Sequence, residues 1–392
     1  MNNMMEPKIR FKGFEGEWLK RTACNIVGRF RTGKLDANAM VSNGKYRFYT
    51  CAKDYFHIDT YAFDDEALLI SGNGENVGYI HYYNGKFNAY QRTYVLTDFS
   101  QNIFFIKSYL KARLKKRINK EKSIGNTPYI RLDTIRDMEI AISPKMEEQQ
   151  AIASYFTSLD SQISAATSRL AALKQMKAAS LQAMFPQEGE TVPKIRFKGF
   201  EGEWKKVKLG DIAKFTKGQG YSKSDLKETG QPIILYGRMY TKYQFVIDEV
   251  DTFANLKDAS ILSKGDEIIM PASGETPEDI ACASAVLAKD IILGGDLNIM
   301  HFDLTKISTP YIALVITYSK THHDLSKCAQ GKSVVHLHNG AISRATISLP
   351  SLAEQQAIAS YFTSLDRQIS LQSQRLEKLK QIKSACLDKM FV

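Results

Sequence analysis

EQQAIASYFTSLD occupies Glu148–Asp160 and returns unchanged at Glu354–Asp366, 206 residues later. A second segment, PKIRFKGFEGEW at Pro7–Trp18, returns unchanged at Pro193–Trp204, 186 residues later. Identity over segments of this length does not arise by chance, so the 392-residue chain is an internal duplication. Its order is domain, helix, domain, helix.

The residues between these identical segments have diverged, and only traces of the duplication survive there. Asp65-Glu66 precedes an apolar run in the first half, as Asp266-Glu267 does in the second. A duplication that merely enlarges a fold would drift evenly along its length, and this reading stays open as the alternative. The contrast favours a fixed scaffold that carries two separately selected domains.

The predicted fold class is α+β, with two similar mixed α/β domains separated by two long antiparallel coiled-coil helices. Alternating apolar residues indicate strands at 46–50, 88–96, 232–236 and 267–270, and longer apolar periods indicate helices at 104–114 and 311–318. The predicted boundaries are a first domain at 1–146, a helix at 147–186, a linker at 187–192, a second domain at 193–352 and a helix at 353–392.

Both long helices carry apolar residues at alternating steps of four and three, which is the seam of a coiled coil. The seam residues are Ile152, Phe156, Leu159, Ile163, Leu170 and Leu173, and in the second copy Ile358, Phe362, Leu365, Ile369, Leu376 and Leu379. The apolar pattern then moves to Met176 and Ile382, which predicts a change of register.

Each helix would be roughly 55 Å long at 1.5 Å per residue, and its stripe must be buried. The nearest complementary stripe belongs to the repeat, so we expect antiparallel pairing that forms a rigid spacer. The alternative is that each helix packs on its own domain and no spacer exists.

The net charge alone is a weak indication of a polyanionic partner, because many basic proteins bind none, and the composition predicts a cytoplasmic protein. The net charge is +11, and residues 1–146 carry nine more basic than acidic side chains. The five cysteines are scattered, which argues against a zinc site or a disulfide framework. No signal peptide and no membrane span are expected.

Several patches interleave basic and aromatic residues, and such side chains can contact phosphates and base edges. A solvated surface is the alternative for any single patch. The candidates in the first half are Arg29, Arg31, Lys34, Lys45, Arg47, Asn88, Gln91, Arg92, and Lys115, Lys116 and Arg117 within the basic run 107–122. Those in the second half are the stretch Lys214–Lys223, which spans Gly218, and Tyr236, Arg238, Lys332 and His336.

Catalytic motifs are absent from the sequence. The glycine-rich stretch 72–78 lacks the spacing of a dinucleotide loop, and no Walker loop is present. At 125–129, Thr127 stands where an adenine methyltransferase motif would need proline. Two histidine pairs, His322-His323 and His336-Leu337-His338, lack a third ligand nearby, so no metal site is expected.

Taken together, the repeats resemble those of the specificity subunits of type I restriction–modification enzymes. The resemblance rests on Phe11–Trp18 with its copy Phe197–Trp204, on Glu148–Ala153 with its copy Glu354–Ala359, and on Gly331–Leu337. It spans essentially the whole chain. It implies a non-catalytic subunit that reads a gapped, two-part double-stranded DNA site, with one domain for each half.

The resemblance also implies partners and cofactors. Two copies of a DNA adenine methylation subunit would dock on the helices and bind S-adenosylmethionine. A motor-nuclease subunit using ATP and Mg²⁺ is a further partner, and no cofactor is expected in this chain. The reading surfaces vary within that family, so no base-reading residue transfers by motif. An interaction scaffold without DNA binding and a solitary methyltransferase remain the rival hypotheses.

Overall fold

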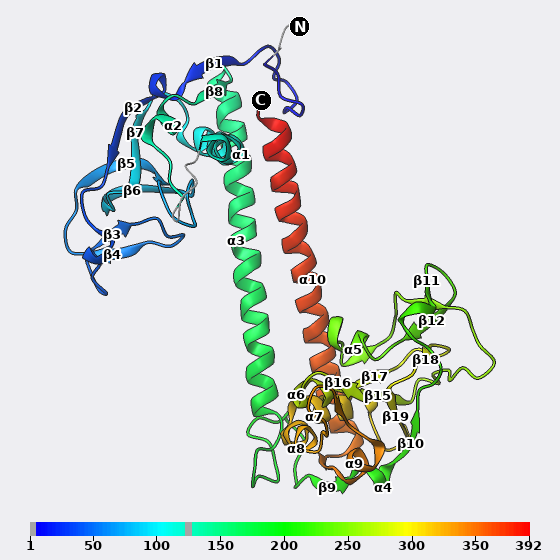
Figure 1. Cartoon of the computed structure of the whole chain (residues 1–392). Coiled ribbons are helices and arrows are strands. Elements are labelled where there is room, and N and C mark those ends of the chain that lie inside the picture. The colour runs from blue at the N-terminus through cyan, green and yellow to red at the C-terminus, as the bar shows by residue number, and fades with distance from the viewer. Residues whose placement is uncertain (1–4, 122–127) are drawn as a thin grey trace. The chain divides into compact units, whose positions relative to one another are not determined.

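The computed structural model describes residues 5–121 and 128–392 (Figure 1). Lys122 and the Gly125-Asn126-Thr127 stretch lie outside these residues. Internal contacts divide the chain into unit 1, residues 1–168 with 374–392, and unit 2, residues 169–373. The predicted boundaries treated the helices as separate segments, whereas these contacts assign part of each long helix to each unit.

Unit 1 combines a six-stranded sheet, a two-stranded sheet and the helices that cover them. The six-stranded order is β2-β7-β5-β6-β3-β4, and β1 pairs with β8. The elements are β1 (Leu19–Thr22), β2 (Val27–Thr32), β3 (Tyr46–Tyr49), β4 (Phe56–Ile58), β5 (Phe63–Ser71), β6 (Ile80–Ala89), β7 (Thr93–Phe99), α1 (Ile103–Glu121), α2 (Leu132–Arg136) and β8 (Glu139–Ile142).

Unit 2 is built on the same plan with shorter strands. Its sheets have the orders β10-β19-β15-β17-β13, β11-β14-β12-β18, β16-β20 and β21-β9. The elements are β9 (Lys205–Lys208), α4 (Leu209–Ile212), β10 (Ala213–Lys217), β11 (Leu226–Lys227), β12 (Gln231–Ile234), α5 (Arg238–Thr241), β13 (Val246–Ile247), β14 (Phe253–Ala254), β15 (Glu267–Pro271), β16 (Ser273–Gly274), α6 (Pro277–Ile280), β17 (Ser284–Val286), β18 (Ile292–Leu293), β19 (Leu297–Phe302), α7 (Thr309–Tyr318), α8 (Lys320–Ser326), β20 (Val335–His336), α9 (Asn339–Arg344) and β21 (Thr346–Leu349).

The main sheets of the two units share their topology. In each, three antiparallel pairings are followed by one parallel pairing, which joins β6 to β3 in unit 1 and β17 to β13 in unit 2. The predicted α+β class and the internal repeat are therefore confirmed. One predicted strand is wrong: residues 88–96 span the end of β6, a turn at 90–92 and most of β7.

The two long helices are α3 (Met146–Ala183) and α10 (Leu352–Met390). Within unit 1 they pair through Tyr155 Oη, which lies 3.4 Å from Cys386 Sγ. Within unit 2 the equivalent contact joins Tyr361 Oη to Ser180 Oγ at 2.9 Å. Tyr361 is the copy of Tyr155, and Cys386 is the copy of Ser180, each 206 residues later. The same contact therefore occurs twice, with the tyrosine on α3 in one case and on α10 in the other, as antiparallel copies require.

The predicted change of register in these helices is wrong. Met176 and Ile382 are exposed at 51% and 38%, whereas the seam continues through Lys177 and Lys383. Lys177 pairs with Asp366 of the opposite helix, and Lys383 pairs with Asp160. A lysine can bury its stem in a seam while its ammonium group pairs at the edge, so the apolar pattern breaks although the heptad does not.

The seam residues also join each helix to the domain cores. Ile152, Phe156 and Leu159 lie in the unit 1 core, and Ile358 and Phe362 lie in the unit 2 core. Helix pairing and packing on a domain therefore occur together, and neither excludes the other. Leu365 and Leu376 are also buried, and Ile163, Leu170, Ile369 and Leu379 are half-buried.

The ends of the long helices are anchored in these cores by a repeated Met-Phe pair. Phe391, just after α10, packs among Trp18, Phe105 and Phe156 of unit 1. Phe185, just after α3, packs against Tyr311 and Phe362 of unit 2. None of the helices in the described residues is apolar over a stretch long enough to span a bilayer.

Candidate nucleic-acid interface

Unit 1 carries a cluster of basic and aromatic side chains on β3, on the segment 55–61 and on the β5–β6 hairpin. We call it the aromatic–basic surface, and it consists of Lys45, Tyr46, Arg47, Tyr55, Tyr61, Tyr83 and Lys86. The Lys86 ammonium lies 4.7 Å from the centre of the Tyr61 ring, and Tyr61 is 5.0 Å from Tyr46. Tyr55 and Tyr61 are exposed at 41% and 46%, which is unusual for large rings.

Arg47 is the most constrained cation of this surface. Its guanidinium lies 4.2 Å from the centre of the Tyr55 ring and 4.6 Å from that of Tyr83. A hydrogen bond to Tyr49 raises the pKa of Arg47, so it stays charged. Stacking between two rings fixes the plane of the guanidinium before any ligand arrives, which favours bidentate recognition of a base or phosphate.

The other predicted DNA contacts of the unit 1 sheet differ in how available they are. Asn88 is buried, and its side-chain amide donates to Thr60 and accepts from the backbone N–H of Ala89. It is therefore not available for DNA at the surface. Arg31 pairs with Asp65 at 2.5 Å and also donates to Thr97. Arg29 pairs with Asp98, although its side chain is 62% exposed. The remaining three are exposed: Lys34, Gln91 and Arg92.

The basic residues of α1 are divided in the same way. Lys115 is exposed, and Lys116 is exposed but lies 3.4 Å from Asp388. Arg117 is half-buried and donates to the carbonyl oxygen of Asp137 at 3.1 Å. The helix therefore offers fewer free cations than its sequence indicates.

In unit 2 the structure brings Tyr236 and His336 toward one surface, through α5, β16 and β20. The ring centres of Tyr236 and Tyr240 are 6.3 Å apart, and the Tyr240 hydroxyl donates to the carbonyl oxygen of Ser273 at 2.6 Å. Ser273 in turn pairs with His336, and the His336 ring stacks on His338. Lys332 is exposed in the preceding loop. This surface differs in composition from that of unit 1.

Two of the unit 2 candidates have structural roles instead. The Arg238 side chain is only 8% exposed and pairs with Asp251 at 2.5 Å. At position 218 a glycine allows a close approach, because a Cβ there would lie 1.8 Å from the carbonyl oxygen of Gly294. Lys223 is exposed nearby.

Sequence reasoning missed Tyr55, Tyr61, Tyr83 and Lys86 of the aromatic–basic surface. Tyr83 and Lys86 had no local turn signal, because Asn84-Gly85 lies within β6, where it pairs with Glu66 and Asp65 of β5. Gly85 has φ of 125°, which favours glycine. Tyr55 and Tyr61 lie in loops whose position depends on tertiary contacts.

The identical segments of the sequence build the same arginine–glutamate–glutamine junction in each unit. Arg10 donates to both carboxylate oxygens of Glu148, at 2.6 and 2.9 Å, and Arg196 does the same to Glu354, at 2.6 and 2.7 Å. The third nitrogen of each guanidinium, Nη1, donates to a loop carbonyl, that of Gly16 or Gly202. The carboxylates are 0% and 1% exposed.

The following glutamine completes each junction. Gln149 accepts a hydrogen bond from the backbone N–H of Asn102, just before α1, and Gln355 accepts one from Ser308, just before α7. Both amides also donate to a carbonyl before their own helix, Ser143 or Pro350. The Glu-Gln pair therefore ties the long helix to its domain, which explains why these residues are unchanged.

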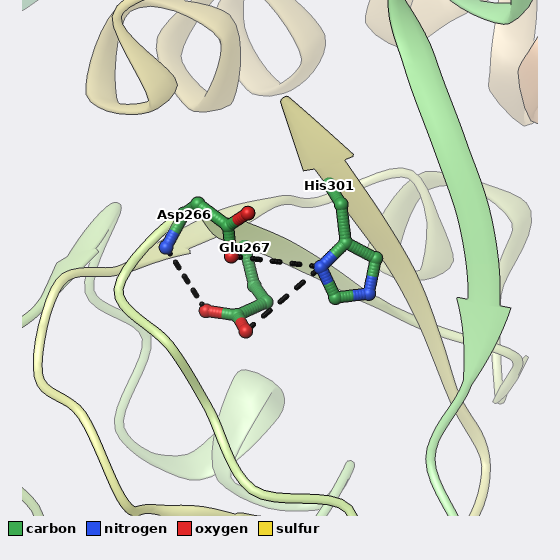
Figure 2. Close-up of side chains that lie close together, drawn as sticks. All are labelled: Asp266, Glu267 and His301. Carbon is green, nitrogen blue, oxygen red and sulfur yellow. Dashed lines mark hydrogen bonds and ion pairs between the residues drawn. The ribbon is translucent and has the colours of Figure 1, made fainter. Parts of the chain in front are cut away.

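Asp266, Glu267 and His301 form a cluster of metal-ligand type in unit 2 (Figure 2). Their ligand atoms lie within 4.8 Å of one another. Glu267 is fully buried, but its oxygens accept hydrogen bonds from the backbone N–H groups of Lys264, Gly265 and Asp266. These bonds account for the buried carboxylate as an anchor of the turn before β15.

The family described as "Type I restriction modification DNA specificity domain" matches residues 24–175 and 201–381. These two matches cover most of the chain, one for each half. The chain therefore belongs to the type I restriction–modification DNA specificity family.

Two curated relatives and one solved structure agree with this assignment. The chain is 39% identical over 171 residues to the type I restriction enzyme EcoDI specificity subunit of Escherichia coli, a match covering 43% of this chain and 37% of that relative's length. It is 20% identical over 339 residues to the MjaVIII specificity subunit of Methanocaldococcus jannaschii, covering 83% and 78%. The fold is shared with the S subunit of a type I system from M. genitalium, at a TM-score of 0.69, 17% identity and 99% coverage of both chains.

Proposed function

We propose that this chain reads a two-part, gapped site on double-stranded DNA, with one domain for each half-site. One observation carries the proposal: two units that share the arginine–glutamate–glutamine junction present different exposed basic and aromatic surfaces. A shared frame with unlike surfaces suits two readers of different sequences on one ligand.

The chemistry of these surfaces fits DNA. Arg47 is positioned for bidentate donation, and Lys45 and Lys86 lie beside exposed rings. Exposed lysines are suited to phosphate oxygens, whose contacts fix position without reading sequence. Two readers on one face of a duplex are best separated by about one helical turn, roughly 34 Å.

The chain has no catalytic role of its own in this proposal. Two copies of an adenine methylation subunit dock on the helices and carry S-adenosylmethionine, and a motor-nuclease subunit with ATP and Mg²⁺ joins them. The exposed faces of α3 and α10 support this, because Gln150, Ser154 and Thr157 and their copies Gln356, Ser360 and Thr363 are identical. Identical exposed surfaces suit two copies of one partner.

Co-expression with the neighbouring methylation subunit in a methylation-free host tests the proposal. We expect a new adenine mark at a two-part motif with a fixed gap, found by sequencing modified bases. A complex that forms without any mark would contradict it and favour the interaction scaffold. Salt-sensitive binding of the chain to duplex DNA separates the same two hypotheses.

A domain replacement tests modular reading. Residues 19–143 lie between Trp18 and Pro144, and residues 205–349 lie between the equivalent Trp204 and Pro350. Replacing the first stretch with the second keeps the identical segments that carry Arg10, Glu148 and Gln149, and we expect a mark whose two half-sites are identical. The unit 2 half-site of the original motif should persist, and its loss would contradict one-domain reading.

A heptad insertion tests whether the helices set the gap. Seven residues added to one helix would break the antiparallel pairing, so they must be added to both, after Ser168 and after Gln374, which are equivalent positions. The added length is about 10 Å, or about three base pairs at 3.4 Å each. We expect a methylated motif whose gap is longer by a few base pairs, and an unchanged gap would refute the ruler.

A further inference from the structure

Unit 1 contains three half-buried lysines around a single carboxylate. Lys111 Nζ lies 3.0 Å from Asp160 Oδ2, and Lys383, on α10, pairs with the other oxygen of Asp160. Their side chains are 29% and 19% exposed, and that of Asp160 is 35% exposed. Lys107, one turn before Lys111 on α1, lies beside the rings of Tyr82 and Phe104. The cluster therefore holds two positive charges more than it can neutralise.

The excess charge disfavours this arrangement in the isolated chain. Burial, followed by repulsion from Lys111, lowers the pKa of Lys107 to about 8. Burial, followed by repulsion from Lys383, also lowers the pKa of Lys111. A lysine with a lowered pKa is one whose charged form costs folding free energy at neutral pH.

Unit 2 shows that the fold does not need these two lysines. At the equivalent positions, 206 residues later, stand Ala313 and Thr317. The remaining pair is kept, with Lys177 Nζ 2.6 Å from Asp366. Lys177 also lies 5.5 Å from the centre of the Tyr318 ring. At this place unit 2 therefore has one lysine for one carboxylate.

Two lysines of the cluster lie on a groove between α1, the 74–80 loop and the helix pair of unit 1. Lys111 and Lys383 line it together with Lys53 and Lys115, and Asp160 and Glu75 are its acidic groups. Tyr79, exposed at 39%, stands at the same groove. Four lysines from three separate segments converge there, which is an arrangement for an extended anion with several charges.

We propose that this groove binds phosphate groups of the DNA backbone through Lys111 and Lys383, and that Lys111 and the adjacent Lys107 give unit 1 a positive charge with no counterpart in unit 2. The inference rests on the proposed function and adds a second role to α10, whose Lys383 joins the contact. A phosphate supplies the charge that the cluster lacks, and lysine meets it as a point charge without base preference. Unit 1 would then hold DNA more tightly than unit 2.

The double variant Lys107→Met with Lys111→Gln tests this in the full chain. Binding to a mixed-sequence duplex is measured over about 50 to 200 mM salt, together with the melting temperature. We expect binding about three- to tenfold weaker and a salt slope smaller by about 0.9 for each phosphate that the variant no longer neutralises. Because repulsion is relieved, the melting temperature should rise by about 2–4 °C.

The matched control is Lys177→Gln, which removes the cation of the unit 2 pair. It should lower the melting temperature and leave the salt slope unchanged. A double variant that is less stable, or that binds DNA with the original affinity and slope, would overturn the inference while the proposed function stands. Normal DNA binding with loss of a protein partner would also overturn it. A wild-type chain that binds no duplex would instead refute the proposed function.

Discussion

Replacing Phe391 with alanine is expected to lower the free energy of unfolding of unit 1 by about 3–5 kcal/mol. The ring is 2% exposed and stacks on Phe156 at 5.6 Å between centroids. It also meets the edges of Trp18 and Phe105 at 6.2 and 5.5 Å. Truncation would leave a cavity among aromatic rings that cannot collapse easily, so the protein would forfeit both burial and packing.

Hydrogen exchange followed by mass spectrometry checks this prediction for each unit separately. Protection should fall in α1 and β8 of unit 1 and stay unchanged in α7 and β15 of unit 2. Ile382→Ala is the control on the same helix, because Ile382 is 38% exposed, and it should change stability by less than about 0.5 kcal/mol. Equal losses in both units would mean that Phe391 supports the helix in general rather than the unit 1 core.

Replacing Glu148 with glutamine is expected to destabilise unit 1 by about 3 kcal/mol, since breaking a buried ion pair leaves an uncompensated charge. Glu148 accepts hydrogen bonds from Arg10, Trp18 and Ser143. The equivalent Glu354→Gln should cost less. Leu349 replaces the serine there, and the buried indole nitrogen of Trp204 makes no hydrogen bond. Chemical unfolding of the two variants measures the difference, and a larger loss for Glu354→Gln would contradict this account.

The pH dependence of the wild type follows from the same site. Burial alone would raise the pKa of Glu148, but hydrogen bonds from Arg10 and Ser143 outweigh it, and the pKa lies below its ordinary value. The carboxylate therefore stabilises unit 1 above the unfolded value of about 4.3, and this contribution is lost as pH falls through the lower folded value. Melting temperatures between about pH 6 and 3 should fall less steeply for Glu148→Gln, and identical slopes would exclude the role of Glu148.

The duplication, the α+β class and the long helices could be predicted from sequence because they rest on identity and periodicity. The register beyond Leu173 could not, since a lysine at a seam position is indistinguishable from a surface lysine until Asp366 is seen opposite it. The strand predicted at 88–96 joined two real strands across a turn that contains neither glycine nor proline.

The candidate site was harder to predict, because availability depends on partners far away in sequence. Arg31 and Arg238 read as surface cations, yet Asp65 and Asp251 neutralise them. Asn88 has the right chemistry for adenine but is buried. Arg47 was predicted from its neighbours in sequence, and the rings that orient it come from Tyr55 and Tyr83.

The division of the chain also sets an order of folding during synthesis. Unit 2 is a continuous stretch, residues 169–373, whereas unit 1 needs residues 1–168 and then 374–392. A ribosome releases the whole of unit 2 before it releases Lys383, Met390 and Phe391, which complete the core and the helix pair of unit 1. The domain that is translated first is thus finished last, and until Phe391 emerges its packing partners Phe105 and Phe156 lack a part of their apolar contact, which favours aggregation of a nascent chain.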